Sequence, residues 1–251
     1  MSKHLRIWLF ALLATLLASN TLLAQGVITM TTSKAGETIL LRVVANGNVS
    51  IEGALETGEM NEDGFKFYTI KNQTITIRCD VTELDCNENQ LTSLNVSKNT
   101  ALTSLECSYN QLTSLDVSKN TALEELDCFS NQLTSLDVSK NTALEVLNCF
   151  SNQLTSLEVS KNTTLTKLWC SYNQLTSLDL SQNIALTKLD CSYDQLTSLD
   201  VSGCTALTEL NCINNQLTSL DVSKNTVLTE LECSYNQLTS LDLSQNTALT
   251  E

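Results

Sequence analysis

Residues 123–143 read LEELDCFSNQLTSLDVSKNTA, and units of this length and pattern follow one another eight times from Val81 to Ala248. A cysteine marks each unit, at Cys86 and then every 21 residues up to Cys233. A fixed period of about 20 to 50 residues is typical of a solenoid, in which each unit buries its apolar stripe only against its neighbours. The sequence therefore predicts a solenoid, and it leaves function to the positions at which the units differ.

Each unit has two similar halves, L-x-x-L-x-C-x-x-N-x and L-T-S-L-D-V-S-x-N-x-A. In an extended segment, positions 4 and 6 of a half point to one side and positions 3 and 5 to the other. We therefore expect columns of leucine, cysteine and valine in the core, stacked at about 4.8 Å per step. The asparagine near the end of each half fits a turn in which a side-chain amide satisfies buried backbone groups.

The motif L-x-x-L-x-C-x-x-N-x-L resembles the leucine-rich repeat consensus over about two thirds of the chain. With cysteine at its sixth position, the unit is similar to the cysteine-ladder repeats of bacterial surface proteins of the internalin J type. The resemblance implies a leucine-rich-repeat solenoid that is mostly β, with short strands, turns and little helix. It also implies a role in adhesion at a cell surface.

The first 24 residues predict a signal peptide. Lys3 and Arg6 precede an apolar run over residues 7–17, and small or polar residues lead up to Ala24. The run is shorter than the roughly 20 apolar residues of a membrane span. We expect cleavage after Ala24 and an exported chain, which is secreted, on the cell surface or in the periplasm, without membrane insertion.

Residues 25–80 do not repeat, and we interpret them as a small β-rich N-terminal cap of the solenoid. An Asn46-Gly47 pair between β-branched runs predicts a hairpin. The repeats occupy residues 81–251, and the sequence stops three residues into a ninth unit. We expect a fragment of a longer protein, or else a partner that covers the open edge. Strands are expected over residues 27–32, 38–44, 49–52, 65–70 and 74–78.

Composition argues against several function classes. The formal net charge is −14, and such a surface repels nucleic acid. The one histidine, His4, lies in the predicted signal peptide, so the mature chain would lack the commonest general base and metal ligand. We expect no enzymatic activity, no catalytic residue, no cofactor and no bound metal.

Ten cysteines in an exported chain raise the question of disulfides. Eight of them fall on one inward column, where parallel side chains are poorly oriented for bridging. We therefore expect a reduced cysteine ladder that packs as core, with Cys79 and Cys204 outside the column. A single file of cysteines also cannot offer the four tetrahedral ligands of zinc.

The second halves carry a column of acidic residues whose stacked charges repel. Lysines three residues further along could balance them, and bound calcium is the alternative, although a straight file supplies calcium's six to eight oxygens poorly. The members of the column are Asp116, Asp137, Glu158, Asp179, Asp200, Asp221 and Asp242.

The first halves vary at their outward positions, above all in the third to sixth units. There they combine aromatic side chains with two lysines, a composition that commonly anchors protein or glycan partners. In the alternative interpretation, Phe129 and Phe150 pack as the rim of the core and the tyrosines are ordinary surface. The candidate binding residues are Phe129, Val146, Phe150, Lys167, Trp169, Tyr172, Lys188 and Tyr193.

The sequence thus predicts an exported interaction or adhesion module that binds a protein or glycan on a host or bacterial surface. The alternative is a structural spacer of a larger surface protein, with no binding activity of its own.

Overall fold

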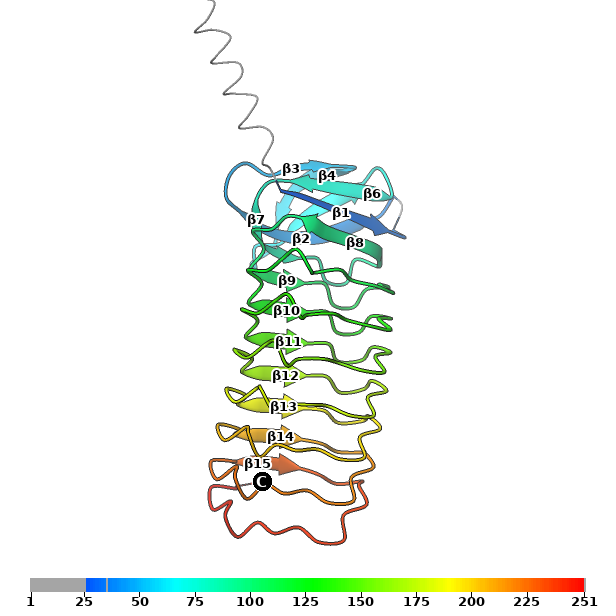
Figure 1. The fold of residues 1–251 in the computed structure, drawn as a ribbon. Helices are drawn as coiled ribbons and strands as arrows, with labels where there is room; N and C mark the ends of the chain where they lie inside the picture. Colours follow the sequence, from blue (N-terminus) through cyan, green and yellow to red (C-terminus); the bar gives the residue numbers. More distant parts are fainter. Residues whose placement is uncertain (1–25, 35, 251) are drawn as a thin grey trace, which may run out of the picture.

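The computed structural model describes residues 26–34 and 36–250, and every regular element in this part of the chain is a β-strand (Figure 1). The predicted signal peptide lies outside the described residues. Among those that are described, no helix has the length and apolarity to span a membrane.

The repeats form the predicted leucine-rich-repeat solenoid, with one short strand per unit stacked in parallel (Figure 1). Neighbouring strands pair at a constant offset of 21 residues, so that Leu126 lies opposite Leu147 and Leu147 opposite Leu168. The strands are β7 (Val81–Asp85), β9 (Ser104–Glu106), β10 (Glu125–Asp127), β11 (Val146–Asn148), β12 (Lys167–Trp169), β13 (Lys188–Asp190), β14 (Glu209–Asn211) and β15 (Glu230–Glu232).

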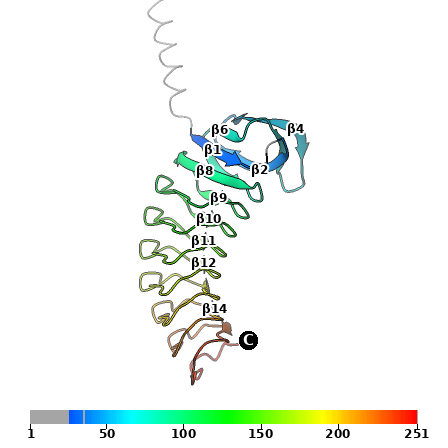
Figure 2. The same cartoon turned by 90° about the vertical axis from the view of Figure 1, so that its right-hand side faces the viewer.

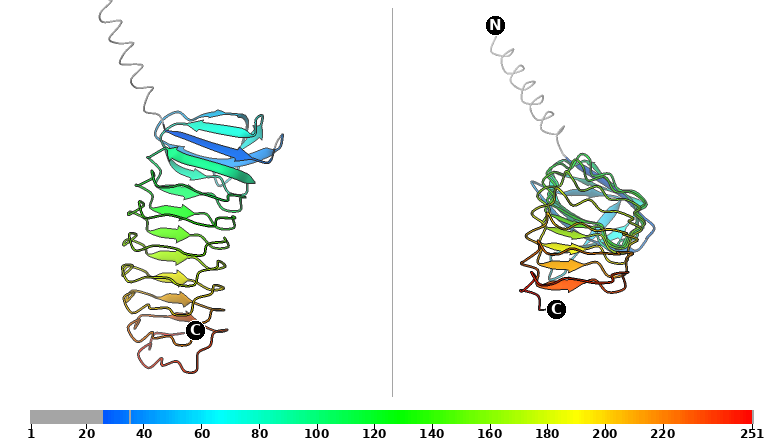
Figure 3. Two further views of the ribbon diagram at one scale, coloured as in Figure 1. Left: turned by 45° about the vertical axis from the view of Figure 1, so that its right-hand side comes forward. Right: turned by 60° about the horizontal axis from the view of Figure 1, so that its bottom comes forward.

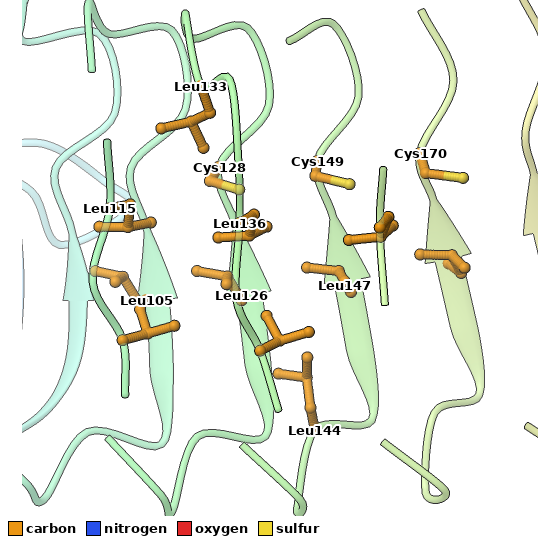
Figure 4. Close-up of a cluster of buried hydrophobic side chains, with 14 of the residues drawn as sticks. Leu105, Leu115, Leu126, Cys128, Leu133, Leu136, Leu144, Leu147, Cys149 and Cys170 are labelled. Carbon is orange, nitrogen blue, oxygen red and sulfur yellow. The ribbon is translucent and has the colours of Figure 1, made fainter. Parts of the chain in front are cut away.

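The core consists of the predicted columns. Figure 4 shows leucines from both halves of successive units facing one another, beside a file of cysteine sulfurs. Leu126, Cys128 and Val138 are fully buried in one unit, and the same positions are buried in its neighbours. All ten cysteines are free thiols, as expected for the eight of the ladder, and burial raises the pKa of the Cys149 thiol to about 12. The ladder is therefore packing material with unreactive thiols.

The asparagine columns perform the predicted role in the turns. Asn131 donates from Nδ2 to the carbonyls of Cys107 (3.0 Å) and Cys128 (3.1 Å), and its Oδ1 accepts the amide of Leu112 at 3.0 Å. Asn141, in the second half, donates to the carbonyl of the preceding unit's asparagine at 2.8 Å. Each side chain thus ties two units together through buried backbone groups.

The acidic column of the second halves is stabilised by local turns as well as by the expected lysines. Asp137 accepts the backbone amide of Ser139 at 2.9 Å, and hydrogen bonds from Ser139 hold the pKa of this carboxyl below its usual range. Among the described residues, none of the ion pairs joins this column to a lysine. The local turn makes the largest contribution, and the charge of Lys140 lowers the pKa of Asp137 further, in agreement with the expected lysine balance.

Residues 26–78 form strands of two sheets that continue directly into the repeats (Figure 2). The five expected strands are present, to within one residue at either end. A sixth strand was not predicted, because its sequence, ALETGEM, lacks the apolar alternation of a half-buried strand. In the structure this strand is almost wholly exposed. The strands are β1 (Val27–Thr32), β2 (Thr38–Ala45), β3 (Ser50–Glu52), β4 (Ala54–Met60), β5 (Lys66–Ile70) and β6 (Thr74–Arg78).

The predicted hairpin around Asn46-Gly47 is wrong. Both edges of β2 are occupied, by β5 on one side and β7 on the other, and β3 pairs instead with β6 in the second sheet. Gly47, at a φ of 126°, carries the chain from one sheet to the other past Cys79. The turn signal was correct, but strand pairing depends on which edges are free.

The two sheets cover both halves of the first unit. Strand β2 pairs antiparallel with β7. Strand β1 pairs antiparallel with β8 (Leu91–Lys98), the second half of that unit, and the left view of Figure 3 shows this blue strand beside the green one. The first rung therefore has no open backbone edge on either side. The same pairing makes β2 part of the sheet face that the repeats present.

Candidate binding surface

The outward face of β7 and β9–β15 is formed by positions 3 and 5 of each first half, because strand side chains alternate between faces. We call it the sheet face. Position 5 contains only acids, amides and one tryptophan, whereas position 3 holds the two lysines. The position 5 column is Asp85, Glu106, Asp127, Asn148, Trp169, Asp190, Asn211 and Glu232, and the position 3 column is Glu83, Ser104, Glu125, Val146, Lys167, Lys188, Glu209 and Glu230.

Five aromatic rings border the sheet face in one continuous file, which we call the aromatic ladder: Tyr109, Phe129, Phe150, Tyr172 and Tyr193. The first three ring-to-ring contacts are edge-to-face, with centroids 4.5, 6.2 and 5.2 Å apart. Tyr172 and Tyr193 are stacked at 4.2 Å. Such pairs favour these geometries and add about 0.5 to 1.5 kcal/mol each beyond burial. The rings support one another along the solenoid.

The turn of each first half positions the tyrosines of the ladder. Position 8 has a left-handed backbone in every unit, with φ of 51° at Tyr109, 54° at Tyr172 and 53° at Tyr193. A residue with a side chain adopts this conformation at a cost of about 1 to 2 kcal/mol. The amide of position 8 donates to the next unit, from Tyr172 to the carbonyl of Ser192 at 3.0 Å, which helps to offset that cost. The turn therefore sets the backbone positions from which the tyrosine rings project, one unit apart.

Trp169 lies where two shallow grooves meet on the sheet face. One groove, of about 400 Å³, is lined by Trp169 with Phe129 and Phe150, two residues of the ladder, and by Glu125, Asp127 and Asn148. The other, of about 220 Å³, is lined in part by Trp169, Lys188, Asp190 and Glu209. Lys188 forms an ion pair with Glu209, so this lysine is already engaged within the chain.

Two half-buried carboxyls of position 5 differ in their partners. Burial raises the pKa of Asp127, and the hydroxyl of Ser108, which donates to Oδ1 at 2.6 Å, opposes that rise. Burial also raises the pKa of Glu106, but Arg42 Nη2 lies 3.3 Å from Glu106 Oε1. Arg42 comes from β2, so the N-terminal strands contribute a cation to the sheet face.

The structure brings the eight predicted residues together on and beside β10–β13. Phe129, Phe150, Tyr172 and Tyr193 belong to the aromatic ladder; Val146, Lys167 and Lys188 are consecutive in position 3; and Trp169 joins the two groups. The tyrosines are exposed, whereas Phe129 and Phe150 are half-buried, between the two interpretations that the sequence left open.

Three contributors were missed from the sequence. Tyr109 occupies the same position 8 as Tyr172, so repeat position alone could have identified it. Asp127 and its groove depend on how deeply a side chain sits between rungs, which no residue pattern reveals. Arg42 reaches Glu106 across 64 residues of sequence, and only the topology of the sheet brings them together.

Comparisons with known proteins agree with this architecture. A family model for leucine-rich repeats, in two copies, matches residues 121–162. The functional domain of InlJ from Listeria monocytogenes, which includes a cysteine ladder, is 40% identical over 72% of this chain, with a TM-score of 0.58. This chain covers 46% of that one, less than half its length. The chain is thus a leucine-rich-repeat protein whose repeats resemble the cysteine-ladder domain of InlJ, as predicted.

More distant solved structures share the fold. A leucine-rich-repeat protein of Leptospira interrogans is 23% identical, with a TM-score of 0.50 over 61% of this chain and 49% of its own. The ectodomain of a receptor kinase from Arabidopsis thaliana, in complex with Casparian strip integrity factor 2, is 26% identical, with a TM-score of 0.57 over 61% of this chain and 21% of that one. A search of curated proteins gave no significant match.

Proposed function

We propose that the chain is an exported interaction module that binds a protein or glycan on a host or bacterial surface. The binding site is the sheet face around Trp169 together with the aromatic ladder. The observation that carries the proposal is the contrast between the halves of the repeat. The second halves are nearly identical, whereas the departures in the first halves gather on one face as contacting aromatic rings and two grooves.

The physical character of this surface supports binding. Exposed aromatic side chains offer large apolar area with few rotatable bonds, so they lose little entropy when a partner covers them. Tyr109, Tyr172 and Tyr193 are 54%, 46% and 41% exposed, yet each ring already contacts a neighbour. A rigid surface that needs little further ordering loses less free energy on association.

Binding, rather than catalysis, suits the chemistry of the chain. The grooves are shallow, and in the described residues their carboxyls have no histidine or metal cluster beside them. Ser108, which donates to Asp127, is fully buried, so its hydroxyl is not open to a substrate. Export is supported by the basic and apolar segment at the N-terminus. The similarity to InlJ supports a place at a cell surface.

Alanine substitution at Trp169 and Tyr172 tests the proposal. The double variant should lose at least tenfold in affinity for a ligand retained from protein and glycan arrays, because aromatic anchors dominate interface energies. Tyr235→Ala is the matched control, since Tyr235 occupies the same left-handed turn position, is 80% exposed and lies outside the aromatic ladder. Unchanged affinity in the double variant, or an equal loss in the control, would place the binding site elsewhere.

A structural spacer is the second candidate, and the uniformity of the second halves favours it. Identical rungs set a fixed length without any need for a partner. A spacer predicts silence of the purified chain across both arrays, whereas the binding proposal predicts at least one ligand that depends on Trp169.

A further inference from the structure

The larger groove at Trp169 combines two kinds of group. Phe129, Phe150 and Trp169 supply aromatic surface, and Glu125 and Asp127 supply carboxylates. The remaining lining residue, Asn148, already uses its amide: Nδ2 donates to Asp127 Oδ2 at 3.3 Å, and Oδ1 accepts the amide of Phe150 at 3.2 Å. The groove therefore combines π-faces with negative oxygens.

Asp127 is held in position without a cation. Its Oδ1 accepts from the Ser108 hydroxyl at 2.6 Å and from the Phe129 amide at 3.4 Å. None of the ion pairs between described residues includes Asp127 or Glu125. A half-buried carboxylate with neutral donors only gains more from an incoming cation than an exposed one does, because water screens it less.

One unit away, a cation of the chain itself already pairs with a carboxylate of the position 5 column. Arg42 lies 3.3 Å from Glu106, which occupies in the preceding unit the place that Asp127 occupies in this one. The same guanidinium lies 5.9 Å from the centroid of the Phe65 ring. A cation set between a position 5 carboxylate and an aromatic ring is thus already part of the sheet face.

We propose that the groove of Phe129, Phe150, Trp169, Glu125 and Asp127 accepts a guanidinium or ammonium side chain from a partner protein. This inference rests on the proposed function and specifies its partner as a protein with an exposed basic segment. Aromatic faces and carboxylates attract a cation together, and the net charge of −14 draws basic partners to the whole chain.

Two labelled peptides test the inference against the purified chain. Both have the sequence Gly-Ser-X-Gly-Ser-X-Gly-Ser, with arginine at X in one and citrulline, its neutral isostere, in the other. Fluorescence anisotropy should show the arginine peptide binding at least tenfold more tightly. Neutralising the groove by Asp127→Asn with Glu125→Gln should lower the affinity for the arginine peptide by about tenfold. The amide side chain fits this column, since Asn148 occupies the next position in it.

The control variant is Asp137→Asn with Glu158→Gln, which removes the same charge from two second halves, that of the unit that carries Glu125 and Asp127 and that of the next unit. Both side chains accept a serine amide there, and an amide oxygen can do the same. The control should keep its affinity within twofold. Equal binding of the two peptides, or equal weakening in both variants, would overturn the inference. A Trp169-dependent array ligand without a basic group would overturn it as well, yet leave the proposed function standing.

Discussion

Replacing Asn152 by alanine should lower the free energy of unfolding by about 4 kcal/mol. Asn152 Nδ2 donates to the carbonyls of Cys128 and Cys149, both at 3.1 Å, and its Oδ1 accepts the amide of Leu133 at 3.0 Å. Alanine would leave these backbone groups buried without that partner, and each such loss costs about 1 to 3 kcal/mol. Urea unfolding followed by circular dichroism measures the change.

Gln153→Ala is the matched control for Asn152. Gln153 is the next residue in the same turn, but its side chain is exposed and only its backbone amide reaches the neighbouring unit. The free energy of unfolding of the control should stay within about 0.5 kcal/mol of that of the parent chain. A loss in Asn152→Ala no larger than in this control would show that the asparagine columns do not hold the units together.

Replacing Asp194 by asparagine should raise the free energy of unfolding by about 1 to 3 kcal/mol at pH 8. Asp194 stands where seven other units have asparagine, and its Oδ1 accepts the amide of Leu175 at 2.9 Å. Its Oδ2 is buried and has no hydrogen-bond partner, whereas Nδ2 of Asn173, at the same position one unit earlier, donates to one carbonyl of the preceding unit and two of its own. Asparagine would supply the missing donor.

The gain from asparagine should depend on pH. Burial raises the pKa of Asp194 from 3.8 to about 7, and the charge of Asp190 adds to the rise. The folded state therefore holds a proton that the unfolded state releases, so Asp194 lowers stability progressively as pH rises from about 4 to 7. Asp194→Asn should melt at a higher temperature than the parent at pH 8, with a much smaller difference at pH 4.

Asp200→Asn separates this effect from a simple loss of charge. Asp200 is exposed, and hydrogen bonds from the Ser202 side chain and, at 2.9 Å, from the Ser202 backbone amide hold its pKa below the usual range. This variant should show no gain at pH 8. A pH-independent gain in Asp194→Asn, or the same gain in Asp200→Asn, would contradict the assignment of the destabilisation to Asp194.

The core could be predicted from the sequence because each unit contacts only its neighbours. An inward leucine in one unit meets the same position in the next, so the 21-residue period specifies both burial and register. The role of the asparagines followed for the same reason. Both predictions rest on local positions repeated eight times.

What could not be predicted depends on contacts between distant segments. The Asn46-Gly47 turn does not close a hairpin because β5 and β7 occupy both edges of β2. Arg42, the cation that pairs with Glu106, also comes from β2. The acidic column is a different case: the serine amides that bind it lie only two residues away, so the sequence could have predicted these turns in addition to the lysine balance.

Side-chain footprinting of the chain in complex with its ligand tests the central claim most directly. Hydroxyl-radical labelling, with and without an array ligand, compares Trp169, Tyr172 and Tyr193 with Tyr235 in one experiment. The claim predicts that the ligand protects the first three residues several-fold and leaves Tyr235 unchanged. Protection of Tyr235 with unaltered labelling of Trp169 and Tyr172 would contradict it.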